Sequence, residues 1–401
     1  MSDKVRLGII GTGGIAGSHL GGYKALVDAG YTQFEIAALA DVNDEQRARF
    51  AAKVEELFGN TPAQFRSAEE LAEMSDVVAV DICTPHAFHH TAAIPCLEAG
   101  LDVMVEKPCG ITIKATDRIL QAAAKKNRIV AVAEQVRRGI KSRCMSWAVN
   151  EAKMIGDPRF LSVMGLGTWD FAEVTKSYAM QWRMLKLLTG GGMIFDAGAH
   201  FADMMYYLFG DVVDVYAWLG CFQDITINST ELGPRPMDVE DTWTSVIRFK
   251  SGMVANWTWS FAAPGEPVAA QILYGSGGSA HDRGGWMHTF QNGADLTLAD
   301  GTKKSYEEIE KEYRAQLSPE TREALFPYGV ENDFALECWD FIDSVQKRRK
   351  PEIDAETTKW TKSICLAAYE SSVCGKPVTV RDVHDGKVSA YQDPINEYWG
   401  I

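Results

Sequence analysis

Two short stretches of the chain combine residues that could carry out acid–base chemistry on a hydroxyl group. One is the tripeptide 106–108, EKP, in which the Lys107 ammonium could hydrogen-bond a reacting oxygen and stabilise negative charge developing on it. The other is the segment 190–200, GGGMIFDAGAH, which places Asp196 and His200 four residues apart. On one helix these side chains would share a face, and a neighbouring carboxylate can orient an imidazole and raise its basicity. We therefore expect His200 to act as a base toward a hydroxyl proton.

A third motif predicts a nucleotide site. The segment 11–16, GTGGIA, fits the G-x-G-x-x-(G/A) pattern between a predicted strand and a predicted helix, where glycines let a pyrophosphate approach the backbone at the helix N-terminus. Asp41 ends the next predicted strand, where a carboxylate can accept hydrogen bonds from an adenosine ribose and repel a 2′-phosphate. NAD is therefore expected in preference to NADP. The expected contacts of this turn are Gly11, Thr12, Gly13, Gly14 and Ile15.

The elements that position these motifs alternate regularly over the first third of the chain. Apolar, β-branched runs predict strands at 5–10, 34–40, 77–83, 103–106 and 129–133, separated by predicted helices at 15–28, 44–58, 90–99 and 114–127. This order predicts an α/β Rossmann domain with a doubly wound parallel sheet over residues 1–138. Ligands bind at the carboxyl ends of such strands, so the further expected cofactor contacts are Thr84, Pro85, His86, His89, Glu106, Lys107 and Gln135.

The pattern changes after about residue 140. Successive strand-like runs at 160–167, 212–219, 242–249, 253–261 and 269–275 are joined by turns, with predicted helices at 141–154, 193–208, 305–325, 334–345 and 357–374. We therefore expect a C-terminal α+β domain with a large open antiparallel sheet over residues 139–380. An aromatic tail, 381–401, is expected to dock on its own subunit or on a neighbour.

Composition excludes several classes of protein. The formal net charge of -14 argues against a general nucleic-acid or anionic-membrane surface, since phosphate binding relies on clustered Lys and Arg. We find no signal-like N-terminal segment and no apolar run that approaches the roughly 20 residues needed to span a bilayer, so a cytoplasmic location is expected. The eight cysteines form no Cys-x-x-Cys motif and are expected to be reduced.

Taken together, the ordered motifs resemble those of the glucose–fructose oxidoreductase, inositol dehydrogenase and rhizopine-catabolism family, Gfo/Idh/MocA. The resemblance covers residues 5 to about 380 and includes, in order, the glycine turn, Thr84-Pro85, Glu106-Lys107-Pro108, Trp182-Arg183, and the triple glycine with D-x-G-x-H. Ala16 replaces the third glycine of the turn, which the pattern tolerates, and His86 stands where the family often has Asn.

The resemblance implies an NAD-dependent oxidoreductase that moves a hydride between nicotinamide and a ring hydroxyl or keto carbon of a sugar, glycoside or polyol. It also implies that Lys107, Asp196 and His200 match the catalytic trio of the family. The exposed face of the C-terminal sheet commonly forms the subunit interface, which implies a homodimer or homotetramer. Further candidate substrate contacts are Arg138, Trp169 and Arg183.

Other interpretations of these residues remain open at this point. The same residues could serve a redox-neutral glycoside hydrolase that oxidises, eliminates, adds water and re-reduces within one turnover. A non-enzymatic NAD-binding regulator is a third hypothesis, against which the intact trio argues. A catalytic metal is not expected, because Asp196 and His200 lack a third ligand at a convincing spacing.

Overall fold

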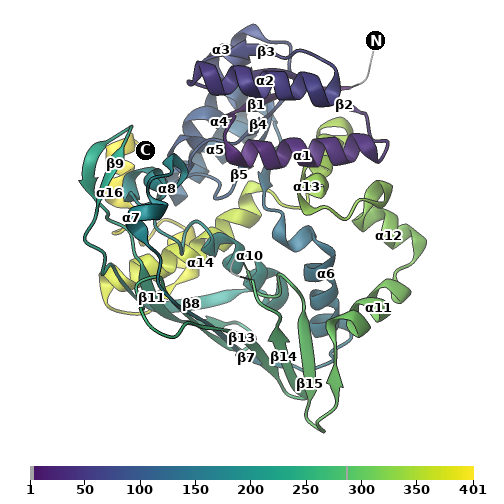
Figure 1. Ribbon diagram of the computed structural model, residues 1–401, viewed down its shortest axis with the longest axis vertical. Helices are drawn as coiled ribbons and strands as arrows, with labels where there is room; N and C mark the ends of the chain where they lie inside the picture. The colour runs from purple at the N-terminus through teal and green to yellow at the C-terminus, as the bar shows by residue number, and fades with distance from the viewer. Residues whose placement is uncertain (1–3, 286–287) are drawn as a thin grey trace. The chain divides into compact units, whose positions relative to one another are not determined.

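The computed structural model describes residues 4–285 and 288–401, and this part of the chain divides into two compact units (Figure 1). The first unit runs to Gly139 and resumes at Ser318–Lys359, whereas the second comprises Ile140–Leu317 and Trp360–Ile401. The first boundary lies one residue from the expected one. The expected substrate domain 139–380 is nevertheless not continuous, because a late segment returns to the first unit, and the tail 381–401 belongs to the second. Residues 1–3 of the expected first domain lie outside the described part.

In the described part of the first unit, six parallel strands form one sheet. They are β1 (Val5–Ile10), β2 (Phe34–Ala40), β3 (Ala63–Phe65), β4 (Ala79–Ile82), β5 (Asp102–Glu106) and β6 (Val130–Ala133), in the order β3-β2-β1-β4-β5-β6. The helices that alternate with them are α1 (Gly14–Asp28), α2 (Asp44–Phe58), α3 (Ala68–Met74), α4 (His89–Glu98) and α5 (Ile113–Lys126). This is the expected Rossmann sheet, whose strand order reverses between β1 and β4.

The returning segment completes the core of the first unit. It contains α12 (Pro319–Leu325) and α13 (Asp333–Lys347), and α13 lies beside α1 (Figure 1). A Cβ on Gly22 of α1 would stand 2.9 Å from the Phe334 carbonyl, so glycine permits this close approach of the two backbones. Phe341 and Ile342 of α13 are fully buried in the same apolar cluster as Leu26 of α1. Burial of this apolar face stabilises the sheet from one side.

The second unit is built on a larger sheet. Within its described residues the order is β16-β15-β14-β13-β7-β12-β11-β8-β17, and every pair is antiparallel except β7 with β12. The bounds are β7 (Pro158–Leu166), β8 (Val212–Gly220), β11 (Thr242–Phe249), β12 (Val254–Ser260), β13 (Val268–Gly275), β14 (Gly278–Asp282), β15 (Ala294–Leu298), β16 (Lys303–Lys304) and β17 (Val378–Thr379). A hairpin of β9 (Thr226–Ser229) and β10 (Gly233–Pro236) stands apart.

Helices and short turns complete the second unit. They are α6 (Ile140–Ser146), a π-helix (Trp147–Glu151), α7 (Phe171–Val174), α8 (Tyr178–Arg183), α9 (Lys186–Thr189), α10 (Gly198–Phe209), α11 (Tyr306–Gln316), α15 (Val380–His384) and α16 (Asp393–Trp399). The boundary between the units falls within α14 (Ala355–Cys374). Within residues 4–285 and 288–401, no helix is both long and apolar enough to cross a lipid bilayer.

One face of the large sheet packs on α10. Phe201 of α10 lies 5.5 Å, ring to ring, from Trp257 of β12, which is 2% exposed. Trp257, Trp259 and Phe261 alternate along the chain, so they share this face. The aromatic tail docks on its own chain, since the Trp399 indole donates to the Leu187 carbonyl oxygen over 2.7 Å.

Candidate active site

The carboxyl edge of the parallel sheet gathers the expected cofactor contacts of the first unit. The glycine turn follows β1, Asp41 follows β2, Thr84 lies beyond β4, Lys107 follows β5 and Gln135 lies beyond β6. Because parallel strands present their carboxyl ends at one edge, sequence reasoning and fold agree on this grouping. The site can therefore be described strand by strand.

The turn after β1 requires glycine at its first position. Gly11 has a φ of +85°, and a Cβ there would stand 2.9 Å from the Cys83 carbonyl and from the Thr84 amide nitrogen. An alanine would therefore be strained and would push on the backbone beyond β4. α1 begins at Gly14, so its first N–H groups face the turn and can bind a phosphate.

Asp41 ties the second strand to the glycine turn. Its Oδ2 accepts hydrogen bonds from the Thr12 backbone N–H over 2.7 Å and from the Thr12 hydroxyl over 2.8 Å. Its Oδ1 accepts from the Asn43 N–H over 2.8 Å. Arg47 donates to the Asp41 backbone carbonyl and pairs with Asp44, so this guanidinium is engaged within α2 and its N-terminus. The Asp41 carboxylate thus orders the glycine turn and also carries negative charge at the carboxyl edge of the sheet.

A buried histidine joins two of the edge turns. The Nδ1 of His89 lies 3.0 Å from the Pro108 carbonyl oxygen, and its Nε2 lies 2.8 Å from the Thr84 carbonyl oxygen. Burial lowers the pKa of His89 to about 4, so at neutral pH the ring donates only one of these two bonds. The contacts place His89 behind the edge, as a brace between turns rather than as a direct cofactor ligand. His86 is likewise buried, at 3% exposed.

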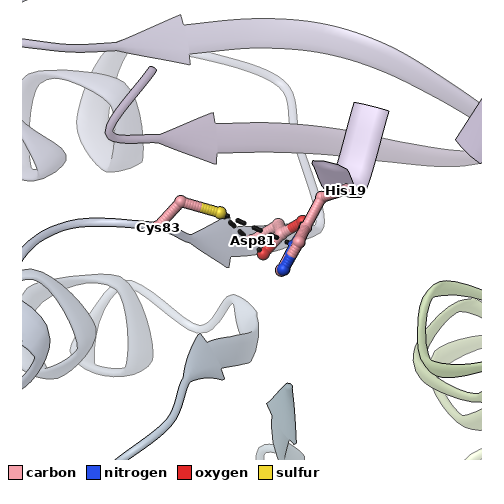
Figure 2. A group of neighbouring side chains, drawn as sticks. All are labelled: His19, Asp81 and Cys83. Atoms are coloured by element: carbon pink, nitrogen blue, oxygen red, sulfur yellow. Dashed lines mark hydrogen bonds and ion pairs between the residues drawn. The ribbon is translucent and has the colours of Figure 1, made fainter. Parts of the chain in front are cut away.

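Glu106 also points inward. Its Oε1 lies 3.1 Å from Nε2 of His19, a fully buried residue of α1 that the sequence reasoning did not single out. The Nδ1 of the same ring lies 2.9 Å from Asp81 Oδ2, and the Cys83 thiol lies 3.5 Å from Asp81 Oδ1 (Figure 2). The only sequence signal for His19 is a histidine on the buried face of an amphipathic helix, which is weak by itself.

His19, Asp81 and Cys83 are also close enough together to share a metal ion. Hydrogen bonding accounts for the same arrangement, because the His19–Asp81 distance is that of a direct bond and the Tyr23 hydroxyl donates to the same Asp81 oxygen over 3.0 Å. We therefore interpret the group as a buried hydrogen-bonded network.

The second unit holds Asp196 and His200, but not on one helix. α10 begins at Gly198, and Asp196 lies in the turn before it, where its backbone N–H donates to the Gly192 carbonyl oxygen over 3.0 Å. The prediction of a helix over 193–208 was therefore wrong at its start, because the glycines favour turns over helix. Asp196 is held instead by Arg183, whose Nε donates to Oδ2 over 2.7 Å.

Arg183 therefore orients Asp196. Its guanidinium also lies 4.1 Å from the centre of the Trp182 ring, and its side chain remains 26% exposed. Arg138 is different, since it is 2% exposed and pairs with Asp340 and Glu352, both at 3.1 Å. These contacts give Arg138 a structural role within the first unit. Trp169 is half-buried, with its ring 4.0 Å from that of Phe261.

The triple glycine is explained by two residues that sequence reasoning missed. The buried Glu240 carboxylate accepts from the Gly192 N–H over 3.0 Å, from the Ile194 N–H over 2.9 Å and from the Tyr369 hydroxyl over 2.8 Å. A Cβ on Gly192 would lie 2.6 Å from this carboxylate, and one on Gly191 would lie 2.5 Å from the Tyr369 hydroxyl. Glu240 and Tyr369 are remote from the glycines in sequence, so no local motif could reveal them.

Substitution of Glu240 by glutamine should change how stability depends on pH. Burial raises the pKa of Glu240 from 4.5 to about 7 despite its three donors. The folded state therefore holds the proton more strongly than the unfolded chain, and this stabilisation is full below pH 4.5 and lost as pH rises to about 7. Between these values the wild type should lose stability as pH rises, whereas Glu240→Gln should not. The difference between their free energies of unfolding should therefore shift in favour of the variant by about 1 kcal/mol per pH unit.

Urea unfolding at pH 5, 6, 7 and 8 measures this difference. The exposed Glu266→Gln variant is the matched control and should follow the wild type at every pH. A constant offset between Glu240→Gln and the wild type would contradict the raised pKa.

The fold and the edge together define a class of protein. A parallel sheet in the order 3-2-1-4-5-6, with a glycine turn after β1 and an acidic residue after β2, is that of a dinucleotide-binding domain. Residues 5–134 match the oxidoreductase family with an NAD-binding Rossmann fold, and residues 148–281 match the GFO/IDH/MocA C-terminal domain. The chain belongs to the Gfo/Idh/MocA family of oxidoreductases, and its first unit carries the NAD-binding fold of that family.

Characterised relatives act on several compounds. The chain is 29% identical over 269 residues to levoglucosan dehydrogenase of Pseudarthrobacter phenanthrenivorans, covering 63% of this chain and 67% of the relative. It is 29% identical over 248 residues to myo-inositol 2-dehydrogenase of Thermotoga maritima (62% and 66%) and 27% identical over 281 residues to D-glucoside 3-dehydrogenase of Escherichia coli (65% and 71%).

Solved structures show the same fold over nearly the whole chain. Levoglucosan dehydrogenase in complex with NADH is similar with a TM-score of 0.72 at 21% identity, covering 94% of this chain and 99% of the other. The WlbA dehydrogenase from Bordetella pertussis, in complex with NADH and UDP-GlcNAcA, gives 0.72 at 20% identity, covering 94% and 98%.

Proposed function

We propose that this protein is an NAD-dependent dehydrogenase that acts on a ring hydroxyl or keto carbon of a sugar, glycoside or polyol. The observation that carries the proposal is the placement of Lys107 directly after β5, at the same sheet edge as the glycine turn and Asp41. The relatives named for levoglucosan, myo-inositol and D-glucosides support this substrate class.

The first unit fits the cofactor. Gly11 leaves room for a phosphate at the backbone, and α1 presents its N-terminus to it. The buried Thr84 hydroxyl oxygen has no hydrogen-bond partner within the described residues, and an amide of the bound cofactor would satisfy it. When bound, NAD supplies the acceptor for the hydride.

Each member of the trio has its own part in the reaction that we propose. His200 takes the proton from the substrate hydroxyl, and in the reverse direction returns it to the alkoxide. Lys107 donates a hydrogen bond to the same substrate oxygen and stabilises the negative charge on it. Asp196, which Arg183 holds in place, orients His200, the base.

A substrate screen tests the proposal. Monosaccharides, glycosides and inositols are incubated with the protein and NAD, and both NADH absorbance and released aglycone are recorded. NADH that accumulates in proportion to oxidised product is the expected result. Release of aglycone without NADH would replace the proposal with redox-neutral glycoside cleavage, and no hydride exchange with any compound would reject an enzymatic role.

We propose that NAD is preferred over NADP because of Asp41. Replacing Asp41 with alanine should weaken NADH binding about 10-fold or more, since a charged hydrogen-bond acceptor and the brace on Thr12 are both lost. The same change should reduce the difference in binding affinity between NADH and NADPH, because the carboxylate no longer repels the 2′-phosphate of NADPH.

Fluorescence titration of both nucleotides measures these affinities. Asp44→Ala, which removes an exposed carboxylate three residues away, is the control and should bind NADH like the wild type. Unchanged NADH affinity in Asp41→Ala would contradict the assignment.

We further propose that the protein forms a homodimer or homotetramer through the exposed face of its large sheet. Aromatic and aliphatic side chains 39–51% exposed lie on this face: Phe160, Tyr216, Trp218, Val246, Val268 and Tyr274. The cross-strand partners Tyr216 and Val246 extend the surface from β8 to β11, and Phe160 and Tyr274 extend it from β7 to β13. Exposed apolar side chains gathered on one face of a sheet are typical of a subunit interface.

Introducing a charge on this face should dissociate the oligomer. Trp218→Glu, at a position 50% exposed, places a carboxylate where a partner would have to desolvate it, so a monomer is expected by light scattering with little change in Tm of the chain itself. Met74→Glu, at a position 72% exposed on the first unit, is the control and should keep the wild-type mass. A monomeric wild type would contradict the proposal outright.

A further inference from the structure

His19 connects four elements of the first unit. It lies in α1, its two ring nitrogens face Asp81 of β4 and Glu106 of β5, and its backbone carbonyl oxygen accepts a weak bond from the Cys338 thiol of α13 over 3.9 Å. The ring is fully buried, and the Asp81 and Glu106 side chains are 0% and 6% exposed. A buried group with this many polar contacts fixes the relative positions of the elements that hold it.

The geometry specifies the protonation of the His19 ring. Each ring nitrogen lies within hydrogen-bond distance of a carboxylate oxygen, which is an acceptor, and only an imidazolium donates from both nitrogens. Burial lowers the pKa of His19, but the charges and hydrogen bonds of Asp81 and Cys83 together outweigh burial and raise this pKa well above 6.5. Burial likewise raises the pKa of Glu106, but hydrogen bonding to His19 and its charge bring it below its usual value.

The bond to Glu106 acts at the residue next to Lys107. β5 ends at Glu106, so Lys107 is attached directly to a residue whose side chain is anchored in the interior. On the other side, the Pro108 carbonyl is held by His89. The lysine is therefore flanked by two residues that buried histidines hold in place.

We propose that His19 is a positioning residue: by hydrogen-bonding Asp81 through Nδ1 and Glu106 through Nε2, it keeps Glu106 ionised and fixes the segment that presents Lys107. This inference rests on the proposed function, in which Lys107 acts on the substrate oxygen. It adds a charged residue that touches neither cofactor nor substrate, and it gives Glu106 a role in the interior rather than in cofactor contact.

Loss of the His19 charge has a defined electrostatic consequence. The titratable or charged groups around His19 and Glu106 are Tyr23 on α1, Asp81 on β4 with Cys83 next to it, Lys107 after β5, His89 on α4, and Glu337 and Cys338 on α13. A carboxyl is neutral or negative, so Glu337, whose pKa is raised well above 4.5 by burial, cannot replace the positive charge of the imidazolium. Without the imidazolium, the pKa of the buried Glu106 must rise, and a protonated Glu106 no longer carries the negative charge that accepts from His19.

His19→Gln is the informative variant, because the amide keeps a donor but removes the charge. We expect kcat at pH 7 to fall by about 10²-fold with substrate KM little changed, as for a small displacement of a catalytic group. We also expect kcat to recover as pH rises through the raised pKa of Glu106, a step that the wild-type profile lacks. In the double variant His19→Gln/Glu106→Gln this added step should vanish, and kcat should match that of Glu106→Gln alone.

Tyr23→Phe is the matched control. It removes a buried hydrogen bond to the same Asp81 oxygen from the same helix, but leaves the bond between His19 and Glu106 in place. Its stability should fall while its pH profile stays that of the wild type. If Tyr23→Phe reproduces the kinetic changes of His19→Gln, or if His19→Gln has the wild-type profile, the proposal is overturned.

A second readout does not depend on activity. In protein labelled with ¹⁵N-histidine, the His19 signals, assigned by their loss in His19→Gln, should show both ring nitrogens protonated at pH 7. A neutral ring at pH 7 would overturn the charge assignment even if turnover were lost in the variant. The proposed function can fail separately. If His19 is an imidazolium but the Lys107→Ala variant retains turnover, the charge assignment of His19 stands and the catalytic assignment of Lys107 is rejected.

Discussion

Replacing Lys107 with alanine will lower kcat by about 10³-fold, because the substrate oxygen loses the donor that stabilises its developing charge. The Kd of NADH will remain within about threefold of the wild-type value, since we propose that the glycine turn and Asp41 provide the contacts to the dinucleotide separately from Lys107. Lys107 follows β5 directly, and its chain neighbours Glu106 and Pro108 are held by buried histidines. The substitution therefore removes an ammonium without removing the contacts that hold this segment.

Initial rates with the substrate found in the screen, together with NADH fluorescence titration, measure the two quantities. Lys125→Ala, which removes an exposed lysine of α5, is the control and should change neither. Equal losses of turnover and of NADH affinity in Lys107→Ala would show that Lys107 binds cofactor rather than assists catalysis.

Replacing Trp257 with alanine will have the largest effect on the stability of the second unit, about 3–5 kcal/mol, as for other fully buried tryptophans. Its ring contacts those of Phe201 and Trp243, at 5.5 and 5.6 Å between centres. A Cβ on Gly198 would lie 2.6 Å from the Trp257 ring, so the first turn of α10 rests directly on this side chain. Because that turn carries His200, turnover should fall together with stability.

Urea unfolding followed by tryptophan fluorescence and circular dichroism measures the change. Trp257→Phe is the matched variant, since it keeps an aromatic ring and removes an indole N–H that has no partner within the described residues. It should lose far less stability than Trp257→Ala. A loss below about 1 kcal/mol in Trp257→Ala would mean that neighbouring rings collapse into the space and that α10 is supported elsewhere.

Local pattern predicted five of the six strands of the first sheet. The runs at 5–10 and 34–40 coincide with β1 and β2, because an apolar strand followed by a glycine turn or an acidic residue has a local signature. The short β3 and α3 were missed, since three half-exposed residues of strand have no distinctive period. The return of Ser318–Lys359 to the first unit was missed as well, because a helix pattern does not say which sheet the helix covers.

The positions of candidate site residues were predictable where they depend on residues nearby in the sequence. They were not predictable where they depend on partners that are remote in the sequence. The positions of Lys107 and Asp41 at the sheet edge could be predicted because each follows a strand. Glu240 and the partners of His19 could not, because a buried carboxylate is recognised only by the donors that surround it in the folded chain. The helix beginning at Gly198 rather than Met193 shows the same limit, since the turn before it is held by Glu240 from the remote loop before β11.

The discontinuous first unit also constrains the order in which the chain can fold during translation. When Gly139 leaves the ribosome, the face of α1 that carries Leu26 still lacks Phe341 and Ile342 of α13. Part of the apolar surface of the first unit therefore stays uncovered while the whole insertion Ile140–Leu317 is synthesised. The complete apolar core of the first unit can therefore form only after α13 has been synthesised.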